Sequence, residues 1–183
     1  SLEEIFKQAE KLGKGRTEFH MVGGLHPDLP FDYYLEMIHG IKEIHPHLHL
    51  KCFTATEIRW IADHIAKMSI EETLETFVRV GLGSLTGGGA EIFAEPTRSQ
   101  ICKGKQSAED WLEVHRIAHN MGLSSTCTML YGHIETDADR VDHILQLREL
   151  QDETNGFTTF IPLSFHPDNT QMSDVRPSGG ILD

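Results

Sequence analysis

Two segments of the chain place a carboxylate just beyond a glycine turn that follows an apolar, strand-like run. Residues 84–93, SLTGGGAEIF, carry Glu91, and residues 126–136, TCTMLYGHIET, carry Glu135. If both strands belong to one parallel sheet, both carboxylates lie at the carboxyl ends of strands, where α/β folds build their active sites. Two acids and four glycines on one rim predict a site for a polar ligand that bears a ribose or an amine.

The loop over residues 22–30, VGGLHPDLP, follows the first expected strand. Gly23 and Gly24 either let a ligand approach the backbone closely or form an ordinary strand-to-helix turn. His26 lies in the same loop as a candidate substrate contact. Glu57 follows the next strand, where it is either a polar pocket residue that meets substrate or an acid favoured by the dipole of a helix amino terminus.

Polar residues near the later strands complete the predicted rim. Arg98 follows Glu91 by seven residues and either binds a carboxylate through two parallel hydrogen bonds or forms a surface ion pair of little worth. The three glycines before Glu91 exceed the need of a turn and permit close packing against a ligand. We predict that Tyr131, His166 and Asn169, at or beyond the ends of the last two strands, contact substrate.

Histidine pairs offer a competing interpretation. His47 and His49 form an H-x-H pair, which on a strand puts both side chains on one face, as in metal-dependent barrel hydrolases. The pair precedes the carboxyl end of its strand, so we expect it near the bottom or middle of a barrel, and with His166 it would form the metal site of a hydrolase. His115 and His119, four residues apart on one helix, are expected to be packing or surface residues, and we predict no metal ligands.

Helical and strand-like periods alternate along the whole chain. Strands are predicted over 17–22, 49–53, 82–85, 124–130 and 157–164, and helices over 2–12, 32–44, 56–66, 70–80, 108–121 and 137–154. Short connections between them predict an α/β fold with a parallel sheet and right-handed crossovers. We expect residues 1–183 to form a single domain, a partial (β/α) barrel truncated at both ends, with strands in chain order and helices on the convex side.

Composition narrows the class of partner. The formal net charge is -12, which argues against binding to nucleic acid or to an anionic membrane. No run of 18 apolar residues occurs, so no membrane span is predicted. The three cysteines, Cys52, Cys102 and Cys127, are sparse and far apart, which fits a reducing cytoplasm and lacks the spacing of a zinc or iron–sulfur site.

Six segments in order resemble one known family: VGGLHPDLP, KCFTATEI, GGGAEIF, TCTMLYGHIET, LRELQDETNGF and FIPLSFHPDNT. Together they resemble the radical S-adenosylmethionine (SAM) enzymes of the menaquinone, or futalosine, pathway, most of all those of the aminofutalosine synthase type. The likeness runs from about residue 17 to residue 173. It implies a TIM-like parallel barrel whose first strand leads into a CxxxCxxC loop that holds a 4Fe-4S cluster. That loop is absent from this sequence, so we expect a central fragment of an enzyme, itself inactive.

The resemblance implies cofactor contacts at the strand ends, namely at Gly23, Gly24, Glu91, Arg98, Gly132, Glu135 and Phe160. The backbone of Gly23 and Gly24 would receive the amino group of the methionine moiety of S-adenosylmethionine. Gly132 and Glu135 match a glycine–acid motif beside the adenosine, and the segment that starts at Phe160 matches one whose backbone reads adenine. Arg98 would pair with the cofactor's carboxylate.

The resemblance also implies a reaction. The cluster donates an electron that cleaves S-adenosylmethionine, and the 5′-deoxyadenosyl radical adds to the enolpyruvyl double bond of 3-((1-carboxyvinyl)oxy)benzoate, a transferase step in menaquinone biosynthesis. The full-length protein would then need an external electron donor. Sister enzymes, namely dehypoxanthine futalosine cyclase and the deazaflavin (FO) synthase subunits, stay open as alternatives. So do two other classes, a metal-dependent barrel hydrolase and a non-catalytic nucleoside-binding domain.

Overall fold

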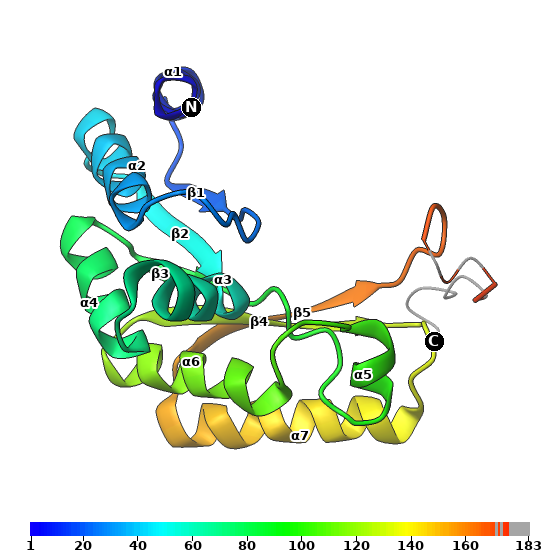
Figure 1. The fold of residues 1–183 in the computed structure, drawn as a ribbon. Helices are drawn as coiled ribbons and strands as arrows, with labels where there is room; N and C mark the ends of the chain where they lie inside the picture. Colours follow the sequence, from blue (N-terminus) through cyan, green and yellow to red (C-terminus); the bar gives the residue numbers. More distant parts are fainter. Residues whose placement is uncertain (171, 173, 176–183) are drawn as a thin grey trace.

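The computed structural model describes residues 1–170, 172 and 174–175, and its centre is a curved parallel sheet (Figure 1). Five strands follow one another across this sheet in chain order. They are β1 (Glu18–Met21), β2 (His49–Thr54), β3 (Ser84–Thr86), β4 (Ser124–Tyr131) and β5 (Phe157–Ser164). Every neighbouring pair is parallel, which confirms the predicted α/β fold and strand order.

The helices cover the outer side of the sheet, as Figure 1 shows for α2, α4, α6 and α7. They are α1 (Leu2–Leu12), α2 (Phe31–Ile44), α3 (Ala55–Trp60), the π-helical segment η1 (Ile61–Ala66), α4 (Ile70–Val80), α5 (Thr97–Ile101), α6 (Ala108–Asn120) and α7 (Asp137–Thr154). Within the described residues β1 and β5 are the two edges of the sheet and do not pair with each other, so the barrel is open.

Local sequence explains where most helices begin. Ser69 and Glu72 form the predicted capping box of α4, because the Ser69 hydroxyl accepts from the Glu72 N–H while the Glu72 carboxylate accepts from the Ser69 N–H. Thr136 caps α7 in the same way. At the other end of α4, Gly81 adopts a φ of +117°, a left-handed conformation that favours glycine, and it turns the chain toward β3.

Three elements differ from the expectation. The helix predicted over residues 56–66 is α3 followed by η1, because the backbone widens into a π-helical turn before Lys67 ends it in a left-handed conformation. The short helix α5 was not predicted, since five residues are too few to show a periodic apolar face. Strand β3 begins two residues later than predicted, after the N–H of Gly83 donates to the carbonyl oxygen of Leu50.

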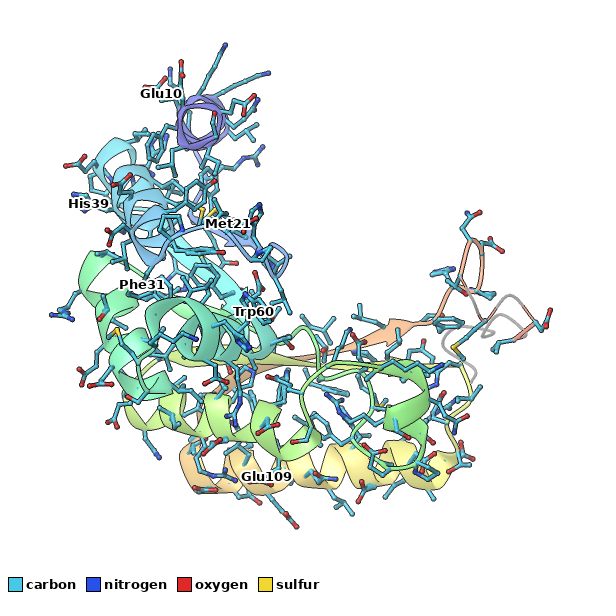
Figure 2. All side chains as sticks on the ribbon, viewed as in Figure 1. Glu10, Met21, Phe31, His39, Trp60 and Glu109 are labelled. Carbon is cyan, nitrogen blue, oxygen red and sulfur yellow. The ribbon has the colours of Figure 1, made fainter. Side chains whose placement is uncertain are left out.

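The hydrophobic core lies between the sheet and the helices. Buried strand residues such as Leu50, Cys52 and Leu85 pack against Ile38, Leu74 and Trp111 of the helices. Charged side chains such as Glu10 and Glu109 project from the outer helices, and Phe31 packs edge-on against Phe77 with ring centroids 5.3 Å apart (Figure 2). Among the described residues, no helix combines the length and the hydrophobicity that crossing a membrane requires.

Candidate functional site

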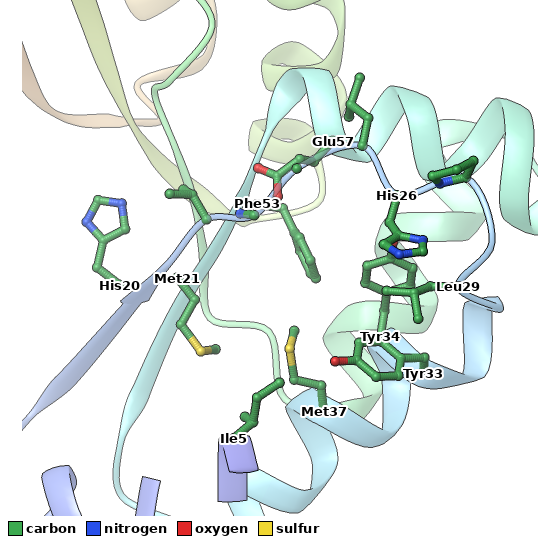
Figure 3. A pocket seen from close by; sticks show the side chains of 15 residues that line it. Ile5, His20, Met21, His26, Leu29, Tyr33, Tyr34, Met37, Phe53 and Glu57 are labelled. Atoms are coloured by element: carbon green, nitrogen blue, oxygen red, sulfur yellow. Dashed lines mark hydrogen bonds between the residues drawn. The ribbon is translucent and has the colours of Figure 1, made fainter. Parts of the chain in front are cut away.

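The loop that follows β1 forms one wall of a pocket with a volume of about 730 Å³ (Figure 3). Gly23, Gly24 and His26 line it on the loop side. Tyr33, Tyr34 and Met37 of α2, together with Phe53 and Glu57, line the rest. The walls are therefore largely aromatic and apolar, with the backbone of the glycine pair and one carboxylate as polar groups, a composition typical of small-molecule sites.

Glu57 links the glycine loop to the end of β2. Its Oε1 atom accepts a hydrogen bond from the N–H of Gly23 at 2.8 Å, and its Oε2 atom accepts from the N–H and the hydroxyl of Thr54 at 2.9 Å each. The side chain is almost fully buried and also lines the pocket. Glu57 therefore caps α3 and also lies at the pocket wall, and its contact with substrate stays a prediction.

The glycine pair leaves room for a ligand. A Cβ atom at Gly24 would meet nothing within 4 Å, and one at Gly23 would meet only Glu57 Oε1, at 3.4 Å. In the described part of the chain, the carbonyl oxygen of Gly23 accepts no hydrogen bond, whereas that of Gly24 accepts one from the N–H of His26 at 3.1 Å. A free carbonyl at an open pocket fits an ammonium group such as that of S-adenosylmethionine. His26 itself is exposed, and its Nδ1 atom accepts from the N–H of Asp28.

The second group of glycines, Gly87 to Gly89, packs closely against other parts of the protein. A Cβ at Gly87 would come within 2.7 Å of the backbone of Cys127 and Thr126, and one at Gly89 would come within 2.6 Å of the Thr56 hydroxyl. The backbone of β4 and the side chains after β2 therefore already fill the space beside these glycines. The expectation that this run packs against a ligand is wrong, because its glycines serve close packing within the protein.

Arg98 is buried, with 2% of its surface exposed, and its guanidinium group organises the loop between β3 and α6. It donates to the carbonyl oxygens of Gly89, Ala90, Ile92 and Gln106, at 2.6 to 3.3 Å. All five N–H groups of the guanidinium are engaged in this way. The structure thus contradicts the prediction that Arg98 pairs with a cofactor carboxylate, since the backbone of the loop uses its donors.

Glu91 and Glu135 lie at the same rim, next to the carboxyl end of β4. The N–H of Leu130 donates to the carbonyl oxygen of Glu91 at 2.8 Å, and the Glu91 carboxylate pairs with Lys105 at the same distance. Glu91, Leu130 and His133 line a second hollow of about 360 Å³ with residues that follow β5. The strand-end argument from the sequence therefore brings these two acids together, and their cofactor roles stay predictions.

The carboxylate of Glu135 closes the turn that follows β4. It accepts from the N–H groups of Gly132 and His133 at 2.6 and 2.8 Å and from Arg140 at 2.7 Å. Burial raises the pKa of Glu135, but these three donors outweigh it, so the pKa lies below its usual value. Glu135 is thus ionised and holds Gly132, with a φ of +84°, in the shape of the turn.

The other predicted residues are spread along the rim and β5. Tyr131 ends β4, with Arg140 5.6 Å from its ring centre. His166 and Asn169 are exposed beyond β5, and the hollow beside them is lined by Phe165 and Thr170 instead. Phe160, in the middle of β5, lines a groove with Cys127 and Ile144 on the helix side of the sheet. Its side chain therefore points away from the glycine loop, and only its backbone is available to a ligand at the rim.

The histidines do not form the metal site of a hydrolase. His49 begins β2, where its Nε2 atom hydrogen-bonds to the Ser84 hydroxyl at 2.7 Å, whereas His166 follows the carboxyl end of β5. These residues lie at opposite ends of the sheet, so they cannot share an ion. His115 and His119 both hydrogen-bond to the Ser125 hydroxyl at 2.8 Å, which confirms that they are packing residues.

The three cysteines do not fit a 4Fe-4S cluster. Cys52 lies in β2, Cys102 ends α5 and Cys127 lies in β4, and all three are buried. Burial raises the pKa of the Cys52 and Cys127 thiols to about 12, whereas a cluster requires thiolates that converge on one loop. These three cysteines therefore do not form the ligand set of a 4Fe-4S cluster.

Sequence reasoning missed the aromatic wall of the first pocket. Tyr33, Tyr34 and Met37 lie on α2 at helical spacing, which reads as an ordinary core stripe. They reach the pocket because α2 packs beside the loop that precedes it. The sequence did offer one signal for this wall, because the glycine loop lies between a strand and a helix that carries aromatic residues. In parallel sheets such a loop and the helix after it meet at the end of the strand.

Known proteins match the chain over most of its length. The chain is 48% identical over 164 residues to an aminodeoxyfutalosine synthase of Thermus thermophilus, a match that covers 90% of this chain and 44% of that protein. It is 49% identical to the aminodeoxyfutalosine synthase of Streptomyces coelicolor, over 96% of this chain and 45% of that protein. It is also 42% identical to a 5-amino-6-(D-ribitylamino)uracil–L-tyrosine 4-hydroxyphenyl transferase of Methanopyrus kandleri, over 91% of this chain and 45% of that protein.

The chain thus spans a little under half the length of these curated relatives. Its fold matches that of methylornithine synthase (PylB), with a TM-score of 0.72 and 19% identity over 100% of this chain and 49% of that one. HydG, a maturase of the FeFe-hydrogenase, follows with a TM-score of 0.69 and 18% identity over 97% of this chain and 38% of its own. A family model described as the Radical SAM superfamily matches residues 1–147. The chain therefore belongs to the radical SAM superfamily.

Proposed function

We propose that this chain is the central part of a radical SAM transferase of the aminofutalosine synthase type, which acts in menaquinone biosynthesis in the cytoplasm. The observation that carries the proposal is the pocket beside Gly23 and Gly24, whose open backbone and free carbonyl fit the amino group of S-adenosylmethionine. The identity of 48% and 49% to two aminodeoxyfutalosine synthases supports the choice of reaction.

The residues of the pocket would divide the work of binding. The carbonyl of Gly23 would accept from the ammonium group of the methionine moiety, and Glu57 would hold the N–H of the same residue in place. The aromatic wall of Tyr33 and Tyr34 would exclude water from the reacting end. When bound, S-adenosylmethionine supplies a 5′-deoxyadenosyl radical, which in this proposal adds to the double bond of 3-((1-carboxyvinyl)oxy)benzoate.

A second function is supported by a specific observation. The identity of 42% to the 4-hydroxyphenyl transferase of Methanopyrus kandleri keeps a reaction of 5-amino-6-(D-ribitylamino)uracil with tyrosine open. We rank it second because the identity to the aminodeoxyfutalosine synthases is higher over a similar share of the chain.

The test uses the full-length protein that contains this chain, reconstituted without oxygen with iron and sulfide and supplied with S-adenosylmethionine and an external electron donor. One reaction receives 3-((1-carboxyvinyl)oxy)benzoate, and a parallel reaction receives the ribitylaminouracil with tyrosine. The proposal predicts a nucleoside adduct by mass spectrometry in the first reaction only. An adduct in the second reaction only would assign the alternative function instead.

A further inference from the structure

On β1, β2, β3 and the first half of β4, the face of the sheet that points away from the helices is polar. Phe19, Met21 and Leu50 pack into the core under the helices, so by strand alternation their neighbours point to the opposite face. The strand register, in which Glu18 pairs with His49 and Lys51 with Ser84, carries this pattern across the sheet. We call this face the inner face. Its polar residues are Glu18, His20, His49, Lys51, Ser84, Ser124, Thr126 and Thr128, and it becomes apolar at Leu130, Ile161 and Leu163.

A polar inner face is unusual for a parallel sheet. Such sheets are normally buried on both faces by apolar residues, and the interior of a (β/α) barrel is filled with branched apolar side chains. Charges placed there lose hydration, which is unfavourable unless a partner compensates them. Here Lys51 pairs with Glu18 and His49 with Ser84, so the polar part of the inner face suits a polar ligand better than an apolar core.

Lys51 is the one lysine or arginine in the five strands of this sheet. Its ammonium group pairs with Glu18 at 2.8 Å, and only 18% of its side chain is exposed. An ammonium group has three N–H donors, so donors remain for a second anion. His20 lies directly beside Lys51 across the β1–β2 pair and also lines the pocket of the glycine loop (Figure 3).

We infer that Lys51, with His20 beside it, binds a carboxylate of the substrate and so helps determine specificity for an aromatic dicarboxylate. The inference rests on the proposed function, whose substrate carries two carboxylates. A chain with a formal net charge of -12 repels such a dianion, so binding needs a local cation. Lys51 supplies it on the inner face, with His20 next to it across the β1–β2 pair.

The test measures equilibrium binding and turnover in the reconstituted full-length enzyme. Lys51→Gln should raise the Kd and the KM for 3-((1-carboxyvinyl)oxy)benzoate about tenfold or more, since a hydrogen bond to a charged group is lost. Lys51→Arg keeps the charge and should retain most of the affinity. The matched control is Lys7→Gln, on the exposed side of α1, which should change neither constant.

An unchanged affinity for S-adenosylmethionine shows that each variant is folded.

The analogue that lacks the ring carboxylate, 2-phenoxyacrylate, separates the two carboxylates of the substrate. If Lys51 binds the ring carboxylate, the wild type should prefer the full substrate and Lys51→Gln should lose that preference. If Lys51 binds the enolpyruvyl carboxylate, Lys51→Gln should weaken both compounds equally. Equal affinity of wild type and Lys51→Gln for both compounds would overturn the inference alone, whereas a wild type that neither binds nor converts the substrate would reject the proposed function and the inference with it.

Discussion

The carboxylate of Glu57 makes the most informative single perturbation, because it caps a helix and also holds the glycine loop. Glu57→Ala removes the acceptor of three hydrogen bonds, from the N–H of Gly23 and from the N–H and hydroxyl of Thr54, at 2.8 to 2.9 Å. The loss of a capping interaction costs about 1 kcal/mol. The N–H of Gly23, which loses a charged acceptor in a part-buried hydrogen bond, adds about 2 kcal/mol, so the expected total is about 3 kcal/mol.

Glu72 provides a matched control for this prediction. It forms the same capping box with Ser69, with both hydrogen bonds at 2.9 Å, but it is exposed and holds no distant loop. Glu72→Ala should therefore lower the free energy of unfolding by only about 1 kcal/mol. Urea unfolding followed by circular dichroism measures both variants, and Glu57→Ala should also weaken binding of S-adenosylmethionine. If the two alanine variants lose the same stability, the link between Glu57 and the glycine loop contributes nothing and the reasoning is refuted.

Three further perturbations separate binding from structure. Gly24→Ala should leave the thermal midpoint nearly unchanged but weaken cofactor binding, whereas Gly87→Ala should lower the midpoint clearly, because its methyl group would meet backbone at 2.7 Å. A larger loss of thermal midpoint for Gly24→Ala than for Gly87→Ala would contradict the roles given to the two glycine segments. In urea unfolding, Arg98→Ala should lower the free energy of unfolding by about 3 kcal/mol or more, whereas Arg148→Ala, which breaks an exposed ion pair, should lower it by less than about 1 kcal/mol. Equal losses would show that the contacts of Arg98 with carbonyl oxygens are unimportant. Burial lowers the pKa of His119 from 6.5 to about 4, so the unfolded chain binds the proton more readily and stability should fall as the pH drops from about 6.5 toward 4. In urea midpoints measured across that pH range, His119→Gln should reduce the dependence of stability on pH, and an unchanged dependence would exclude His119 as its source.

The sequence predicts the fold well where local signals are strong. The bounds of α4 and α7 match the prediction because Ser69 and Thr136 begin them with capping boxes. Strand order follows from the alternation of strands and helices, which leaves right-handed crossovers between neighbours as the simplest connection. The helix α5 and the π-helical segment carry no such periodic signal, so their backbone is decided by packing.

The candidate site was predictable only in part, because its contacts join residues far apart in the sequence. The glycine pair and Glu57 were both singled out, but 34 residues separate Gly23 from Glu57, and no local pattern shows that they bond. Arg98 was assigned the wrong partner, since the curl of its own loop places four carbonyl oxygens around it. Lys51 escaped notice because its side of the sheet depends on the register with β1.

The central claim is that the glycine loop after β1 holds the methionine end of S-adenosylmethionine. A crystal structure of the full-length protein with S-adenosylmethionine bound tests this claim most directly. We predict the amino group of the cofactor at about 2.7–3.2 Å from the carbonyl oxygen of Gly23, with the Gly23–Glu57 hydrogen bond intact. A methionine moiety bound instead in the hollow beside Glu91 and His133, with the glycine loop empty, would contradict the account.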